Sequence, residues 1–129
     1  MNRRRNGRMF PRAVAVGAGA SFLAFGLWAM VAPQTFFDAV ARFEPYNQHF
    51  VQDVGAFQIG LGAVLILSVI DATAGAPPVA LLGAGTGSGA HLVSHLVGLD
   101  LGGTPGTDIP FFAAVTLLLL VGGVMARRQ

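Results

Sequence analysis

The stretch IPFFAAVTLLLLVGGVMA, residues 109–126, decides the fold of this chain, because its 18 residues carry no charge. About 17–25 apolar residues in a helix are enough to cross a bilayer core of about 30 Å. Three earlier stretches are similar, at residues 13–32, 50–70 and 79–99, although the second is free of charge only from Val54 onward. The sequence therefore predicts an all-α fold, a four-helix transmembrane bundle over residues 13–126.

The composition agrees with a lipid environment. Hydrophobic residues make up 53% of the chain and charged residues only 11%, with a mean hydropathy of +0.64. Soluble domains carry about 25% charged residues. The chain has no cysteine, which excludes disulfides, thiolate metal sites and CxxC redox chemistry.

The positive charge lies in the tails. All eight basic residues are arginines, and seven of them flank the apolar stretches: Arg3, Arg4, Arg5, Arg8, Arg12, Arg127 and Arg128. Flanking arginines mark the cytoplasmic side of a membrane protein. We therefore expect a multi-pass protein of the cell (plasma) membrane with cytoplasmic tails at 1–12 and 127–129. The bilayer is its expected partner, and this placement of charge argues against nucleic acid.

The N-terminal arginines and apolar run also resemble a secretory signal peptide. The run of about 20 residues exceeds the 7–15 of a cleavable core, and Pro33 directly follows Ala32. These features favour a retained first helix.

The segments 33–50 and 100–108 then face outward. In the first of them Phe36, Phe37, Val40 and Phe43 recur at helical spacing, which predicts a short amphipathic helix in the outer interface. Thr35 and Asp38 form an approximate capping box for it. The alternative is an ordinary aromatic loop. The aromatic residues near this side are typical of an interfacial belt: Trp28, Phe36, Phe37, Phe43, Tyr46, Phe111 and Phe112.

Polar residues of the second apolar stretch define its inward face. His49 and Asp53 are one helical turn apart and share a face with Ala56, Gly60 and Ala63. Small residues allow helices to approach closely in lipid, so this face is predicted to contact another helix. Gln58 lies about 140° away from Asp53 and is expected to bond a neighbouring helix.

The third apolar stretch has one small, polar face and one bulky face. Bulky residues such as Leu92 and Leu96 should meet lipid, whereas the small face should pack inside the bundle. Gly83 with Gly87, and Gly85 with Gly89, both have GxxxG spacing. The small face carries Gly83, Gly87, Ser94 and Gly98 together with His91 and His95.

Both faces place their ionisable residues in the outer half of the membrane. The prediction is that His49, Asp53, His91 and His95 converge there, near Asp100. Three uses of such a cluster remain open. It could bind a divalent metal ion such as zinc, handle protons or a small solute, or fix helix packing by hydrogen bonds.

Two motifs carry a resemblance. The stretch YNQHFVQDVGAFQIGLG at 46–62, followed by HLVSH at 91–95 and DLGG at 100–103, resembles a pattern in uncharacterised four-helix integral membrane proteins of actinobacteria. The layout is more loosely similar to DoxX-like proteins. The resemblance implies a compact four-helix bundle and no assigned reaction.

The function expected from these features is a small membrane scaffold or accessory subunit with an outward-facing His/Asp pocket, and no catalytic residue is predicted. The alternative is a metal-binding or proton-linked small-solute site at His49, Asp53, His91 and His95. In a third interpretation the glycine-rich face forms a homo-oligomer or docks on a larger membrane complex.

Overall fold

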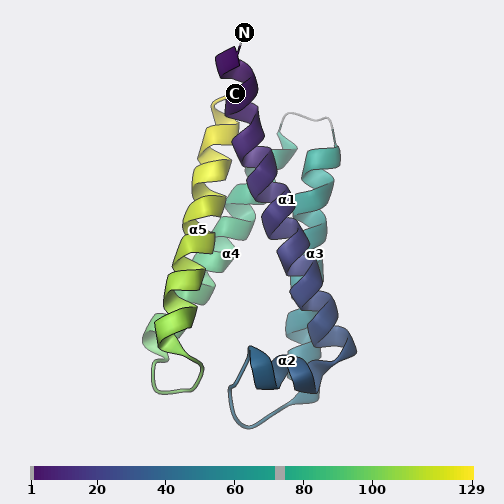
Figure 1. Ribbon diagram of the computed structural model, residues 1–129, viewed down its shortest axis with the longest axis vertical. Helices are drawn as coiled ribbons and strands as arrows, with labels where there is room; N and C mark the ends of the chain where they lie inside the picture. The colour runs from purple at the N-terminus through teal and green to yellow at the C-terminus, as the bar shows by residue number, and fades with distance from the viewer. Residues whose placement is uncertain (1, 72–74) are drawn as a thin grey trace.

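The computed structural model describes residues 2–71 and 75–129, which form five helices and contain no strand. Four helices are long and one is short, arranged as Figure 1 shows. The first three are α1 (Asn2–Val31), α2 (Pro33–Ala39) and α3 (Gln48–Ile70), and the last two are α4 (Ala76–Val97) and α5 (Pro105–Arg127). The all-α prediction is confirmed.

The four long helices lie where the apolar stretches predict them, with ends shifted by a few residues. The largest difference is in α1, which begins at Asn2 and so runs through the basic tail. Three of the four are long and apolar enough to cross a membrane, namely α1 from Arg8, α3 and α5. α4 has 22 residues, but its glycines, serines and histidines lower its hydropathy.

Both chain termini lie at one end of the bundle, and α2 lies at the other (Figure 1). We call the first the arginine end, because it carries the exposed side chains of Arg8, Arg12, Arg127 and Arg128. The opposite end, with α2 and the α4–α5 loop, is the loop end.

Glycines allow α1 and α3 to pack closely. A Cβ atom at Gly26 would lie 2.7 Å from the carbonyl oxygen of Gly55, and one at Gly62 would lie 2.7 Å from that of Gly19. Gly19 and Gly26 are seven residues apart, as are Gly55 and Gly62, so each pair lies on one face of its helix. Such small residues bring helix backbones together in membranes.

The pair α4 and α5 has a similar contact surface. A Cβ atom at Gly85 would come 2.7 Å from a methyl group of Leu120, and one at Gly123 would come 2.7 Å from the Cγ of Leu82. One turn further toward the α4–α5 loop, the Thr116 hydroxyl donates to the buried Ser88 hydroxyl at 3.1 Å. The 85/89 register, not the 83/87 register, therefore faces α5.

The two helix pairs meet in one central core. Leu65 of α3, Leu81 of α4 and Leu119 of α5 are fully buried there beside Ala15 of α1. Away from the core, α3 packs mainly on α1 and α4 mainly on α5. The bundle is thus two helical pairs joined at their middle.

The predicted amphipathic helix is shorter than its pattern, because α2 ends at Ala39. Phe36 and Phe37 are buried against Ala29 and Val51 of the neighbouring helices, so their face contacts protein. Phe43 lies outside the helix, and the prediction that it belongs to the same helical face is wrong.

The capping-box prediction for α2 is also wrong. The residue before the helix is Ala32, and no side chain caps this end. Instead the Thr35 hydroxyl donates to the Ala32 carbonyl and accepts from the Trp28 indole at 2.8 Å. Thr35 thus joins α2 to α1.

Candidate functional site

Two histidines of α4 form a direct contact near the loop end. His91 and His95 are one turn apart, and their Nε2 atoms lie 3.1 Å from each other. Their rings stack with centroids 5.0 Å apart. An imidazole nitrogen is either a donor or an acceptor when the ring is neutral. One ring must therefore donate to the other.

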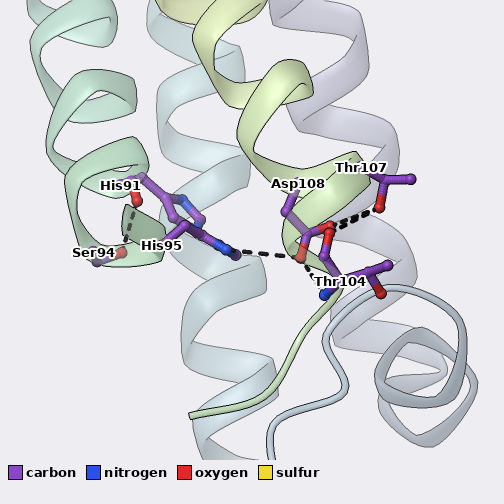
Figure 2. A network of polar contacts seen from close by, with 6 residues as sticks. All are labelled: His91, Ser94, His95, Thr104, Thr107 and Asp108. Atoms are coloured by element: carbon purple, nitrogen blue, oxygen red, sulfur yellow. Dashed lines mark hydrogen bonds and ion pairs between the residues drawn. The ribbon is translucent and has the colours of Figure 1, made fainter. Parts of the chain in front are cut away.

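A carboxylate of α5 lies at the far side of His95. The Nδ1 of His95 is 3.7 Å from the Oδ2 of Asp108, and only 11% and 21% of the two side chains are exposed. The three groups form a line from α4 to α5 (Figure 2). The cluster of His91, His95 and Asp108 is called the His–Asp line below.

Local structure at the start of α5 fixes Asp108. The backbone N–H of Thr104 donates to Asp108 Oδ2 at 2.6 Å, and the Thr107 hydroxyl lies 3.3 Å from the other oxygen. Asp108 also lies in the first turn of α5, where the helix dipole favours negative charge. The carboxylate that faces His95 is thus held by its own helix (Figure 2).

Aromatic rings surround the two imidazoles. Phe112, one turn after Asp108, stacks on His91 with centroids 4.2 Å apart. It lies tilted against His95, with centroids 4.8 Å apart. Phe43, from the segment between α2 and α3, meets His95 edge-on at 5.7 Å. These rings fix the orientation of the histidines and exclude water from one side of them.

Two glycines shape the loop next to the site. Gly102 and Gly103 have φ angles of +123° and +78°, which side chains with a Cβ rarely adopt. The Gly103 N–H donates to the Arg42 carbonyl at 3.2 Å. A Cβ at Gly103 would lie 2.9 Å from both Asp108 Oδ2 and the Phe43 ring. The DLGG motif therefore closes the loop tightly around Asp108 and Phe43.

The four predicted metal ligands do not come together. His49 and Asp53 pair with each other at 3.5 Å at the start of α3, and their side chains are 88% and 54% exposed. Among the described residues, no three His, Cys, Asp or Glu side chains lie close enough to share a metal ion. The prediction of one metal site from His49, Asp53, His91 and His95 is wrong. The cluster forms as two separate pairs, His49 with Asp53 and His91 with His95.

The predicted packing glycines lie in open space. A Cβ at Gly60, Gly83 or Gly87 would meet no other part of the chain within 4 Å. The expectation that they pack inside the bundle is wrong. In α4 it is Gly85 and Gly89 that face α5, and in α3 Gly60 lies on an exposed face of the helix.

The remaining predicted polar and small residues have local roles. The Ser94 hydroxyl donates to the His91 carbonyl of its own helix at 2.7 Å. Gly98 caps the C-terminus of α4, and its backbone N–H donates to the Ser94 carbonyl. Asp100 is exposed in the loop, and Gln58 is partly buried on α3. The glutamine that reaches a neighbouring helix is Gln52, which donates to the Met30 carbonyl of α1 at 3.2 Å.

Sequence reasoning missed Asp108 and Phe112 as site residues. The run Thr-Pro-Gly-Thr-Asp at 104–108 indicates that the last helix begins near Thr104, since proline is favoured in the first turn of a helix. That start would have placed Asp108 and Phe112 on one helical face, four residues apart.

Comparison with protein-family models, curated proteins and solved structures gave no match for this chain.

Proposed function

We propose that the protein is a small multi-pass membrane component with four crossing helices, both termini in the cytoplasm, and a proton-binding site at its outer end. Three helices long and apolar enough to span support the membrane assignment. The two termini share one end of the bundle (Figure 1), as an even number of crossings requires. Exposed arginines at that end favour the cytoplasm.

Crossing by α4 can be tested at its two ends, and the absence of natural cysteine makes single-cysteine labelling clean. We expect Asp100→Cys to react with a membrane-impermeant maleimide in intact cells. Gly75→Cys should react only after permeabilisation, as should the control Gln129→Cys. Labelling of both Gly75→Cys and Asp100→Cys from the same side would show that α4 does not cross.

The functional proposal depends on the direct contact between the two imidazoles, with Asp108 on the far side of His95. Histidine titrates near neutral pH, and ionisable groups within membrane helices are functional candidates by default. The spacing allows one consistent hydrogen-bond direction. His91 Nε2–H donates to His95 Nε2, and the Nδ1–H of His95 points to Asp108.

This direction gives the site a simple mechanism. A proton taken up at the free ring nitrogen of the more exposed His91 makes it an imidazolium. The proton on its Nε2 then moves across the 3.1 Å contact to His95 Nε2. The positive charge now lies beside the Asp108 carboxylate. The site thus takes up a proton from the outer side and holds it next to a fixed negative group.

Histidine-selective ¹⁵N NMR of the protein in lipid nanodiscs tests this proposal. His49 is the internal reference, because its side chain is almost fully exposed and its partner is Asp53, outside the His–Asp line. His91 and His95 should titrate as a coupled pair, each curve showing the same two steps.

Variants make the test specific. His95→Gln should leave His91 with a single-step curve, and the matched control His49→Gln should leave the coupled pair unchanged. Asp108→Asn should alter both steps of the pair. Independent titration of His91 and His95 in the unmodified protein, with no coupling between them, would refute proton sharing and leave the two imidazoles with a packing role alone.

A further inference from the structure

An apolar groove runs between α3 and α4. It has a volume of about 950 Å³ and exists because α3 packs mainly on α1 and α4 mainly on α5. Gly60 and Gly83 lie on its walls, and no other part of the chain fills the space beside them. The other wall residues are almost all apolar, including Phe57, Leu61 and Val79.

The groove lies toward the arginine end. Its walls comprise residues between 56 and 71 of α3 and the following turn, and between 76 and 84 of α4. The α3 part is about 22 Å long at the rise of an α-helix. One leaflet of a bilayer core is about 15 Å deep. The groove therefore covers the depth of the leaflet on the arginine side.

The rim of the groove is charged. Asp71 lines it, and the Arg12 guanidinium donates to the Val69 carbonyl at 3.5 Å, two residues before Asp71. Arg8, Arg127 and Arg128 are exposed at the same end. Positive charge thus exceeds negative charge at this end of the bundle, which favours the phosphate group of a lipid there.

A second copy of the chain fits this mouth poorly. Two copies with the same membrane orientation would bring their arginine ends together when packed through the groove, and like charges repel. An anionic phospholipid has the opposite pattern, with apolar chains for the groove and a phosphate for the arginines.

We infer that the groove between α3 and α4 binds an acyl chain of an anionic phospholipid from the arginine-side leaflet, with the phosphate at Arg12. The inference uses the proposed membrane orientation but not the His–Asp line. Because the Asp71 carboxylate repels a phosphate, we place the phosphate on the α1 side of the mouth, where Arg12 lies. The bound lipid fills the space that the two helix pairs leave between them.

Native mass spectrometry of the purified protein, titrated with dioleoylphosphatidylglycerol or dioleoylphosphatidylcholine, tests the inference. Gly83→Leu should lower phosphatidylglycerol affinity by about tenfold or more, because its side chain enters the groove. Arg12→Gln should lower the affinity about fivefold, since an arginine near anionic lipid contributes about 1 kcal/mol. It should also remove the preference for phosphatidylglycerol over phosphatidylcholine.

Matched controls separate this site from general lipid adhesion. Gly87→Leu also adds a side chain into open space on α4 but outside the groove, and Arg127→Gln removes one charge elsewhere at the same end. Gly87→Leu should bind lipid as the unmodified protein does, and Arg127→Gln should keep more of the affinity and of the preference for phosphatidylglycerol than Arg12→Gln does. Equal losses in the controls, or no retained lipid in the unmodified protein, would overturn the inference.

Two further readouts separate a bound lipid from a second copy of the chain, and the groove from the proton site. A dimer mass that disappears in Gly83→Leu while lipid affinity is unchanged would assign the groove to a second copy and overturn the lipid inference. The coupled histidine titration should be the same in Gly83→Leu as in the unmodified protein. Failure of lipid binding with intact coupling would refute the groove inference alone, and the reverse would refute the proton site alone.

Discussion

Replacing Gly26 by leucine is expected to destabilise the protein by about 3 kcal/mol or more. The Cβ atom alone would lie 2.7 Å from the Gly55 carbonyl oxygen and 2.9 Å from the Ile59 backbone nitrogen. Backbone atoms cannot turn aside as a side chain can, so α1 and α3 must separate. Separation also opens the contact of Gly19 with Gly62 further along the helices.

The measurement is reversible unfolding in mixed micelles, followed by circular dichroism. Gly17→Leu is the matched control on the same helix, because a Cβ there meets nothing within 4 Å. It should be neutral or slightly stabilising, since leucine has a higher helix propensity than glycine. If Gly26→Leu does not fold, Gly26→Ala provides a milder test. Equal stability of the Gly26 and Gly17 variants would contradict the close packing of α1 on α3.

Replacing Gly103 by alanine is expected to cost about 2 kcal/mol and to disturb the His–Asp line. A φ of +78° costs an alanine about 1–2 kcal/mol. Its Cβ would also lie 2.9 Å from Asp108 Oδ2 and from the Phe43 ring. Relief of these contacts moves the carboxylate away from His95, so the histidine titration should change together with stability.

Gly106→Ala is the control for this second effect. Gly106 lies only three residues later, inside α5, and a Cβ there meets nothing within 4 Å. Alanine should stabilise the helix by about 0.5–1 kcal/mol and leave the titration unchanged. An unchanged titration in Gly103→Ala would show that this loop does not position Asp108.

The helices of the fold were predictable from the sequence, because uncharged apolar runs of this length have few other structures in lipid. Which face of each helix packs against its neighbour was harder to predict. α4 offers two GxxxG registers, 83/87 and 85/89, and both satisfy the spacing rule. Only packing selects between them: Gly85 and Gly89 face Leu120 and Thr116 of α5, whereas Gly83 and Gly87 stay open.

The candidate site was half predictable for a similar reason. The i,i+4 spacing of His91 and His95 determines their contact, because both side chains belong to one helix. Their partner depends on the path of the loops. By membrane depth alone Asp53 is the expected partner, but α3 packs on α1 and keeps Asp53 with His49. The loop through Gly102 and Gly103 brings Asp108 instead.

The division of the bundle into two helix pairs affects how the site would respond to movement. His91, His95, Asp108 and Phe112 all belong to α4 and α5, so a tilt of this pair as a rigid unit would carry the whole proton path with it. Phe43 lies in the segment that leads into α3 of the other pair and meets His95 edge-on. This segment is also tied to the α4–α5 loop, because the Gly103 N–H donates to the Arg42 carbonyl. A tilt of one pair against the other about the central leucines would move Phe43 toward or away from His95. The angle between the two pairs would then control the access of water to His95.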